Sequence, residues 1–210
     1  MTQILPAILE NSFDAIQQKL NRLKGVSVYA QIDIADGVFI PEKTWNDPSQ
    51  LRKLENGIKL DMHLMVEKPE QWIQECSKDP VFRFTFHQEA TYDILRTIKI
   101  IKDLQKEVGV AINLDTPVTV LYDILNQIDL VLVMGVNPGA QGREFDAAAI
   151  DKVRELREKD QNIQIGVDGG VGPMVAESLI NAGANVLVSG SYLFNEDDIQ
   201  GAIDTLSGKN

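Results

Sequence analysis

The sequence is poor in cysteine, in basic residues relative to acidic ones, and in long hydrophobic runs. Its single cysteine, Cys76, excludes an intrachain disulfide and is typical of a reducing compartment. A formal net charge of -11 argues against nucleic acid as a partner, because a nucleic-acid-binding surface needs a basic patch. No apolar run approaches the ~18 residues of a membrane span, and the first residues lack the basic segment of a signal peptide. We therefore expect a cytoplasmic protein that binds neither membrane nor nucleic acid.

The remaining composition is that of an ordinary globular protein. The chain has 210 residues, of which 44% are hydrophobic and 24% charged, so it can bury a large core. It contains no low-complexity tract, no proline-rich linker and no repeat of solenoid length. We therefore predict one domain over residues 1–210. Cys76 is interpreted as a small, buried helix residue rather than as a nucleophile.

Short β-rich runs alternate with longer amphipathic stretches along the chain. The strand candidates cover residues 4–9, 26–36, 58–66, 81–87, 108–114, 130–134, 163–168 and 184–190. The helix candidates cover residues 12–24, where Ser12 can act as the N-cap, and 69–76, 92–106, 118–125, 147–158, 173–182 and 197–206. Eight strand–helix units in about 200 residues predict a closed (β/α)8 TIM barrel of the α/β class. The structural alternative is a doubly wound open sheet.

Residues 31–37, with the sequence QIDIADG, place an amide and an acid on one side of an otherwise apolar strand. Strand side chains alternate faces, so Gln31 and Asp33 point one way while Ile32 and Ile34 point the other. Helices cover the outer face of every barrel strand, so the polar side chains should face the barrel interior. The same alternation of apolar and polar residues occurs in the strands at 58–66, 81–87, 108–114 and 163–168.

The inward polar side chains are the candidates for chemistry. They are Gln31, Asp33, His63, His87, Asn113 and Asp168. Gln31 and Asp33 are roughly 7 Å apart along one strand face, so both can contact a single ion. With His63 and Asp168 they supply two carboxylates, one imidazole and one amide oxygen. The alternative for each histidine is a hydrogen-bonded core residue, which we favour for His87 and disfavour for His63.

Glycine-bearing turns follow the last three predicted strands. The loop after residues 130–134 contains Gly139, Ala140, Gln141 and Gly142, and the next two turns contain Gly169 with Gly170 and Gly190 with Ser191. Backbone N–H groups in such turns form anion sites, and in barrels the loops after strands seven and eight often hold phosphate. Ordinary turns are the alternative for each glycine pair taken singly. Their joint placement favours a phosphate site that does not require lysine.

Several motifs in fixed order resemble the ribulose-phosphate 3-epimerase family over nearly the full length. The motifs are LPAIL, QIDIADGVFIP, DMHLMVEKP, FHQEA, VMGVNPGAQGREF, VDGGV and SGSYLF. The resemblance implies a phosphate-binding barrel that inverts carbon three of a ketopentose 5-phosphate such as ribulose 5-phosphate or xylulose 5-phosphate. It also implies one divalent metal, held in the family by two histidines and two aspartates, and a homo-oligomer.

The resemblance assigns roles to residues of this chain. It implies that Asp33 and Asp168 are the two proton carriers, and that both also bind the metal with His63. It implies that His63, Met65 and Met134 contact the substrate, the methionines by packing against an enediolate. It further implies a substrate and phosphate site at Gly139, Ala140, Gln141, Gly142, Gly169, Gly170, Gly190 and Ser191.

The chain departs from the family pattern at several positions. Gln31 stands where the family has a metal-binding histidine, Ala35 where it has methionine, and Ala7 where it has serine; Gln88 and Arg143 alter two further motifs. An amide oxygen binds zinc more weakly than imidazole does, so zinc, iron, manganese and magnesium all stay open, with a shift toward the harder ions. The alternative function is a diverged sugar-phosphate-binding protein with weak or no epimerase activity.

Overall fold

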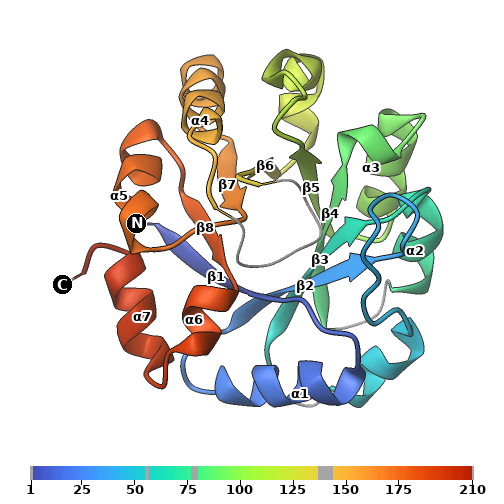
Figure 1. The fold of residues 1–210 in the computed structure, drawn as a ribbon. Helices are drawn as coiled ribbons and strands as arrows, with labels where there is room; N and C mark the ends of the chain where they lie inside the picture. The colour runs from blue at the N-terminus through green and yellow to red at the C-terminus, as the bar shows by residue number, and fades with distance from the viewer. Residues whose placement is uncertain (1, 55–56, 77–79, 137–143, 210) are drawn as a thin grey trace.

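The eight strands close into a parallel barrel in chain order, with β1 paired to both β2 and β8. This computed structural model describes residues 2–54, 57–76, 80–136 and 144–209. The strands are β1 (Gln3–Ile8), β2 (Tyr29–Ala35), β3 (Lys59–Met65), β4 (Val81–His87), β5 (Glu107–Ile112), β6 (Leu130–Met134), β7 (Gln164–Asp168) and β8 (Val186–Ser189). Figure 1 shows helices placed around this ring of strands. The predicted TIM barrel is confirmed, and the open sheet is wrong because β1 pairs with β8.

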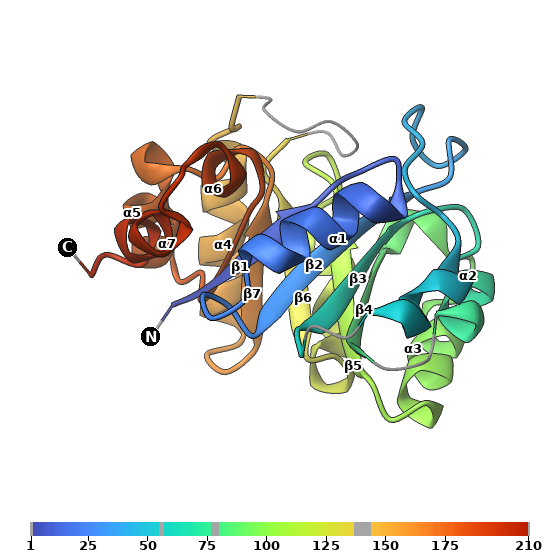
Figure 2. The ribbon, with the colours of Figure 1, turned by 90° about the horizontal axis from the view of Figure 1, so that it is seen from below.

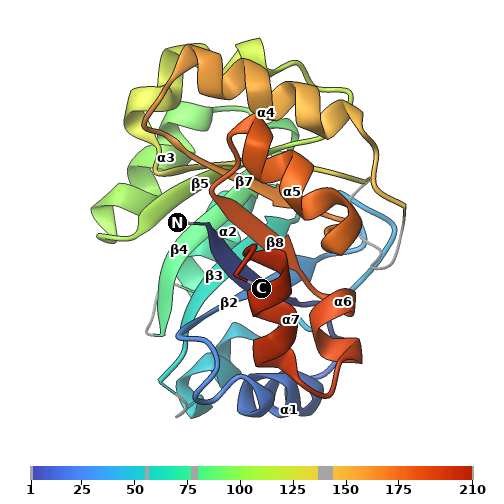
Figure 3. The same cartoon turned by 90° about the vertical axis from the view of Figure 1, so that its left-hand side faces the viewer.

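Each predicted helix has a helical element at its place, with shifted ends in most cases, whereas η1, η2 and α6 were not predicted. The helical elements are α1 (Phe13–Arg22), η1 (Pro48–Lys53), α2 (Pro69–Glu75), η2 (Gln88–Ala90), α3 (Ile94–Asp103), η3 (Val118–Gln127), α4 (Ala148–Lys159), α5 (Pro173–Ala182), α6 (Ser191–Asn195) and α7 (Ile199–Leu206). Figure 2 shows α1 lying across β1 and β2, and Figure 3 shows α5, α6 and α7 around β8.

Local chemistry explains where several helices begin and end. Ser12 caps α1 as predicted, because its side chain accepts a hydrogen bond from the Ala15 N–H at 3.3 Å. The helix predicted over 92–106 is shorter, because Asp93 is the N-cap of α3 and Gln105 adopts a positive φ of 57° after its end. Cys76 is the buried C-cap residue of α2, which confirms its interpretation as a packed residue.

The helix predicted over 118–125 is wrong in type. The segment is instead a 3-10 helix, η3 (Val118–Gln127), which follows Pro117 with no side-chain N-cap. Its first turn carries three β-branched residues in succession, Val118, Thr119 and Val120, which lower α-helix propensity. The turn nevertheless packs its apolar side chains, such as Leu121, into the core.

Buried apolar residues form an outer layer between strands and helices and a smaller layer inside the barrel. The outer layer includes Ile32 and Ile34 of β2, as their alternation predicts. The inner layer draws on β1, β5, β6 and β8 and consists of Leu5, Ala7, Ala111, Leu130, Leu132, Met134, Val186 and Val188. The strands β2, β3, β4 and β7 contribute polar residues to the interior instead, so one side of the barrel interior is available for chemistry.

Candidate active site

Four of the predicted site residues, which come from β2, β3 and β7, meet inside the barrel. Asp33 pairs in register with His63 on the neighbouring strand, and His63 Nδ1 lies 3.0 Å from Asp33 Oδ1. The same ring nitrogen lies 3.5 Å from Asp168 Oδ2, which comes from β7. Gln31 and His63 are fully buried, Asp33 is 6% exposed, and Asp168 is half-buried. The sequence prediction that these four side chains converge is therefore confirmed.

The Gln31 amide joins the acids to each other. Its Nε2 donates to Asp33 Oδ1 at 2.8 Å and to Asp168 Oδ2 at 2.6 Å, and lies 3.3 Å from His63 Nδ1. Its Oε1 is buried and has no hydrogen-bond partner among the residues that the structure describes. The Nε2 of Gln31 therefore binds both carboxylates, while its Oε1 remains an unsatisfied acceptor.

This cluster has the spacing of a metal-binding group. Asp33, His63 and Asp168 each offer one ligand atom, and these atoms lie within 4.8 Å of one another. Divalent ions bind such atoms at about 2.0–2.2 Å, which places neighbouring ligand atoms about 3 Å apart. The distances from Gln31 Nε2 and His63 Nδ1 to their neighbours, 2.6–3.5 Å, match that separation. A half-turn of the amide would present the unpartnered Oε1 as a fourth ligand, so the donor set fits a divalent ion.

Burial and like charge disturb the proton equilibria of the cluster. Burial, reinforced by the negative charge of Asp33, raises the pKa of Asp168 to about 7. Burial alone would lower the pKa of His63, but the hydrogen bond to Asp33 and the charges of the nearby aspartates raise it above its usual value. At neutral pH Asp168 can therefore carry a proton although it is an acidic residue.

Thr44 fixes the end of β2 and was not found from the sequence. Its hydroxyl donates to the Asp33 carbonyl at 2.9 Å and accepts from the Ala35 N–H at 2.8 Å. Thr44 is buried, so these bonds hold the backbone from the Asp33 carbonyl to the Ala35 N–H, directly after the Asp33 side chain. Its position in a loop after the strand carries no periodic signal that would mark it.

His87, which we expected to be a core histidine, lies directly behind His63. The two rings are stacked, with His63 Nε2 and His87 Nε2 3.0 Å apart. His87 Nδ1 lies 3.5 Å from Glu89 Oε2, and the Phe39 ring centroid is 5.0 Å from that of His87. His87 is fully buried, as expected of a core histidine, and it also contacts the site residue His63, as expected of an inward candidate. Glu89 was missed, although its spacing of two residues from His87 was visible in the sequence.

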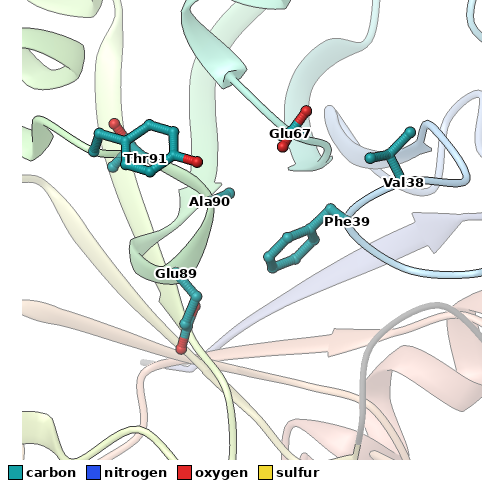
Figure 4. Close-up of a pocket in the computed structure, with 7 residues that line it drawn as sticks. Val38, Phe39, Glu67, Glu89, Ala90 and Thr91 are labelled. Carbon is teal, nitrogen blue, oxygen red and sulfur yellow. The ribbon is translucent and has the colours of Figure 1, made fainter.

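Asn113, the remaining inward candidate, lies just beyond β5 and not in the cluster of acids. Its backbone N–H donates to Glu89 Oε1 at 2.9 Å, so its main chain contacts the carboxylate that lies beside His87. Glu89 and Phe39 also line a small pocket outside the barrel interior, together with Val38, Glu67, Ala90, Thr91 and Tyr92. Figure 4 shows Phe39 and Glu89 on two sides of this pocket.

The two glycine turns after β7 and β8 are neighbours, as their predicted role requires. Gly169 and Gly170 have positive φ angles of 102° and 68°, which favour glycine. The Ser189 hydroxyl at the end of β8 donates to the Val171 carbonyl at 2.9 Å and so joins the two turns. Gly190 precedes α6, which begins at Ser191. The predicted residues Gly139, Ala140, Gln141 and Gly142 lie outside the described residues.

The two predicted methionines are both buried and lie on different sides of the interior. Met65 packs with Ala35 and Ile40, with Phe39 against the same cluster. Met134, at the end of β6, belongs to the inner apolar layer. Each is at most 3% exposed, so each can form an apolar wall beside the acids.

Comparison with known proteins identifies both a family and a fold. The model of the "Ribulose-phosphate 3 epimerase family" matches residues 3–194. The chain is 35% identical to ribulose-phosphate 3-epimerase of Bacillus subtilis (strain 168), covering 99% of each chain. It is 37% identical to the chloroplastic ribulose-5-phosphate-3-epimerase of Arabidopsis thaliana, covering 95% of this chain and 74% of that protein.

Solved structures with low sequence identity share the fold alone. The KGPDC structure from Streptococcus mutans has a TM-score of 0.71 at 14% identity and covers 100% of this chain and 97% of its own. A structure of 3-hexulose-6-phosphate synthase has a TM-score of 0.68 at 16% identity and covers 99% of both chains. Among the described residues, no helix has the length and apolar character needed to cross a bilayer.

Proposed function

The chain belongs to the ribulose-phosphate 3-epimerase family, and on that premise we propose that it interconverts ribulose 5-phosphate and xylulose 5-phosphate or a close ketose phosphate. The observation that carries the proposal is the meeting of two carboxylates from β2 and β7. Asp33 Oδ1 and Asp168 Oδ2 both accept from the same Gln31 nitrogen, at 2.8 and 2.6 Å. Epimerisation at a carbon beside a ketone needs two such groups, because one carboxyl cannot reach both faces of a planar intermediate.

Asp33 and Asp168 divide the proton transfers between them. The ionised carboxylate removes the proton from carbon three, so the C–H bond breaks and its electron pair enters an enediolate. The other carboxyl group donates a proton to the opposite face of that carbon, which inverts its configuration. In the metal-free protein, burial raises the pKa of Asp168 to about 7, so one member of the pair can carry a proton at neutral pH. The reverse reaction exchanges the two roles.

Asp33, His63, Asp168 and the Oε1 of Gln31 would hold a divalent ion. Such an ion supplies positive charge that stabilises the negative charge developing on the substrate oxygens. Because Gln31 offers a neutral amide oxygen in place of an imidazole, the site favours magnesium or manganese more than a set with a second histidine would, with zinc and iron as the other candidates.

The remaining site residues orient the substrate. Met65 and Met134 exclude water from the reacting carbons by packing on either side of the site. The turns at Gly169, Gly170, Gly190 and Ser191 present backbone N–H groups to the phosphate, at the position where barrels commonly bind it. The bridge from Ser189 to Val171 supports this assignment because it holds the two turns together.

Solvent exchange tests the proposal directly. Ribulose 5-phosphate is incubated with the protein in D2O, and NMR follows both deuterium entry at carbon three and formation of xylulose 5-phosphate. We expect both signals, and we expect Asp33→Asn and Asp168→Asn each to slow them by about 10²–10⁴-fold. A loss below tenfold in either variant would contradict the two-carboxylate assignment. Phosphate-ester binding by the wild type with no exchange would favour the diverged binding protein instead.

A further inference from the structure

The short helix α6, which follows β8, is held at its C-terminal end by an arginine from α1. Arg22, the last residue of α1, donates from Nη1 to the Phe194 carbonyl and from Nη2 to the Glu196 carbonyl, both at 2.8 Å. Phe194 lies in α6, and Glu196 is the C-cap residue of that helix. The last carbonyl groups of a helix have no partner within it, so the planar guanidinium satisfies two of them at once.

A second cation of α1 contacts the same part of α6. Lys19 lies three residues before Arg22, so both side chains leave the same face of α1. The Lys19 Nζ lies 4.8 Å from the centroid of the Phe194 ring and 2.7 Å from Glu10 Oε1, just after β1. The Arg22 guanidinium lies 5.7 Å from the same ring centroid. Phe194 also packs into the outer core, so both its ring and its carbonyl are fixed.

The fixed end of α6 is one helical turn away from the glycine turn after β8. The Phe194 N–H donates to the Gly190 carbonyl at 3.0 Å, so one backbone hydrogen bond connects the two ends of α6. Beside this turn, the Ser189 hydroxyl donates to the Val171 carbonyl, in the segment after β7. A helix of five residues is not stable alone, so the groups that hold the two ends of α6 determine its orientation.

We propose that Arg22 is a positioning residue that orients the turn at Gly190 and Ser191 for the phosphate group of the substrate. The inference rests on the proposed function, in which this turn presents backbone N–H groups to the phosphate. Arg22 would act through Phe194, because it binds the Phe194 carbonyl while the Phe194 N–H binds Gly190. Backbone donors cannot turn independently of the chain, so a tilt of α6 misdirects them together. The phosphate is not a reacting group, so the effect should be on KM and not on kcat.

Arg157 offers a matched comparison, because it makes the same kind of contact elsewhere. From α4 its Nε and Nη2 donate to the Gly183 carbonyl at 3.2 and 2.9 Å, and its Nη1 donates to the Ile163 carbonyl at 2.9 Å. Gly183 is the C-cap residue of α5, which has ten residues. About 15 Å of helix therefore separates this contact from the start of α5. Only Arg22 holds a carbonyl one turn away from a predicted phosphate-binding turn.

Inorganic phosphate tests the inference without turnover. Its titration into ¹⁵N-labelled protein should shift the amide signals of Gly190 and Ser191, and the titration curve gives the phosphate Kd. Arg22→Met removes both hydrogen bonds but keeps an apolar stem. We expect it to raise this Kd about 5–10-fold, because a charge-assisted hydrogen bond is normally worth at least about tenfold and part of that loss reaches the turn. KM for ribulose 5-phosphate should rise by the same factor, with kcat within about twofold. An unchanged phosphate Kd in Arg22→Met would overturn the proposal.

Two further variants separate positioning from charge and from stability. Arg22→Lys keeps the charge but lacks the planar fork that spans two carbonyls, so its phosphate Kd should lie between those of wild type and Arg22→Met. A wild-type Kd in Arg22→Lys would show that charge alone acts, which would overturn the positioning role. Arg157→Met should lower the urea midpoint at least as much as Arg22→Met but keep the phosphate Kd within about twofold of wild type. Equal losses of phosphate affinity in Arg157→Met and Arg22→Met would overturn the proposal in favour of general destabilisation.

The test distinguishes this inference from the epimerase proposal. Phosphate binding is measured without substrate, whereas deuterium entry at carbon three reports epimerisation. If the wild type exchanges deuterium but phosphate leaves the Gly190 and Ser191 signals unchanged, the positioning inference alone is overturned. If phosphate binds with the expected dependence on Arg22 but no deuterium enters, the positioning inference is supported and the epimerase proposal fails.

Discussion

Replacing Asp168 by asparagine should abolish most activity while stabilising the metal-free protein. The folded protein raises the pKa of this group from 3.8 to about 7, because the carboxylate is buried beside Asp33. A difference of about 3 pKa units corresponds to about 4 kcal/mol of unfavourable free energy when the group is ionised. The side chain is 14% exposed, so this value is an upper bound. Asparagine carries no charge but keeps an oxygen that accepts from Gln31 Nε2, so it removes the penalty and keeps the contact.

The pH dependence follows from the direction of the shift. The folded protein binds the Asp168 proton more tightly than the unfolded chain does, so the wild type loses stability as pH rises from about 4 to 7. Asp168→Asn should lack this loss. Urea unfolding of chelator-treated protein should therefore show the variant more stable at pH 8, by up to about 4 kcal/mol, and this advantage should shrink by more than half at pH 5.

The comparison refutes the reasoning if the variant is less stable than wild type at pH 8, or if the difference does not change with pH. Either result would mean that ionised Asp168 meets no net penalty in the fold. Retained activity in Asp168→Asn would refute the assignment of Asp168 as a proton carrier, because such a group normally contributes about 10²–10⁴-fold to the rate. Opposite effects on stability and activity in one substitution are the signature of a strained functional group.

Three further substitutions or reactions test neighbouring parts of the site. Gln31→His should raise Zn²⁺ affinity at least tenfold in titration calorimetry, because imidazole is a better zinc ligand than an amide oxygen; unchanged affinity would contradict a ligand role for position 31. Gly170→Ala should raise KM for the sugar phosphate about tenfold, because Gly170 has a φ of 68° and an added Cβ would lie 2.9 Å from Phe145; an unchanged KM would exclude this turn from phosphate binding. Cys76 should resist a thiol reagent until urea unfolds the chain, because burial raises its pKa to about 12; reaction in the folded state would contradict the packing.

The barrel could be predicted because each of its units repeats a short β-rich run followed by a longer amphipathic stretch. Strands β4 and β6 match their predicted ranges, and α5 does too, since Pro173 begins it and Gly183, with a φ of 114°, ends it. The other strand ends differ from their predicted positions by one to three residues, except the end of β7 at Asp168, because the pattern does not show which terminal residues pair with a neighbouring strand. Hydrophobic periodicity did not distinguish an α-helix from the 3-10 helix η3, since both bury one apolar face.

The site was only partly predictable because alternation gives the direction of a side chain and not its partners. Gln31, Asp33, His63 and Asp168 were found from their inward positions. The amide orientation of Gln31, which ties the acids together, depends on atoms from three strands and leaves no mark on the sequence. Thr44 lies in a loop and Glu89 in the single 3-10 turn η2, and neither segment is long enough for a period to indicate which way a side chain points.

Replacing a second buried aspartate, Asp61, by asparagine should destabilise the protein, whereas Asp168→Asn should stabilise it. Asp61 lies one inward position before His63 on β3 and is fully buried, but its Oδ2 is 2.8 Å from both Nε and Nη2 of Arg83. Asp61→Asn should cost about 3–5 kcal/mol in urea unfolding, because the Arg83 guanidinium, 2% exposed, loses its buried charged partner and keeps only the half-exposed Glu107, 3.4 Å from its Nη1. The double variant Asp61→Leu/Arg83→Met should recover part of that loss, since it leaves no unpaired charge in the barrel. Equal stability of Asp61→Asn and wild type would show that the pair does not hold this end of the barrel. An aspartate that faces a guanidinium thus stabilises the fold, whereas Asp168 faces another carboxylate, and its pKa is set for proton transfer at the expense of stability.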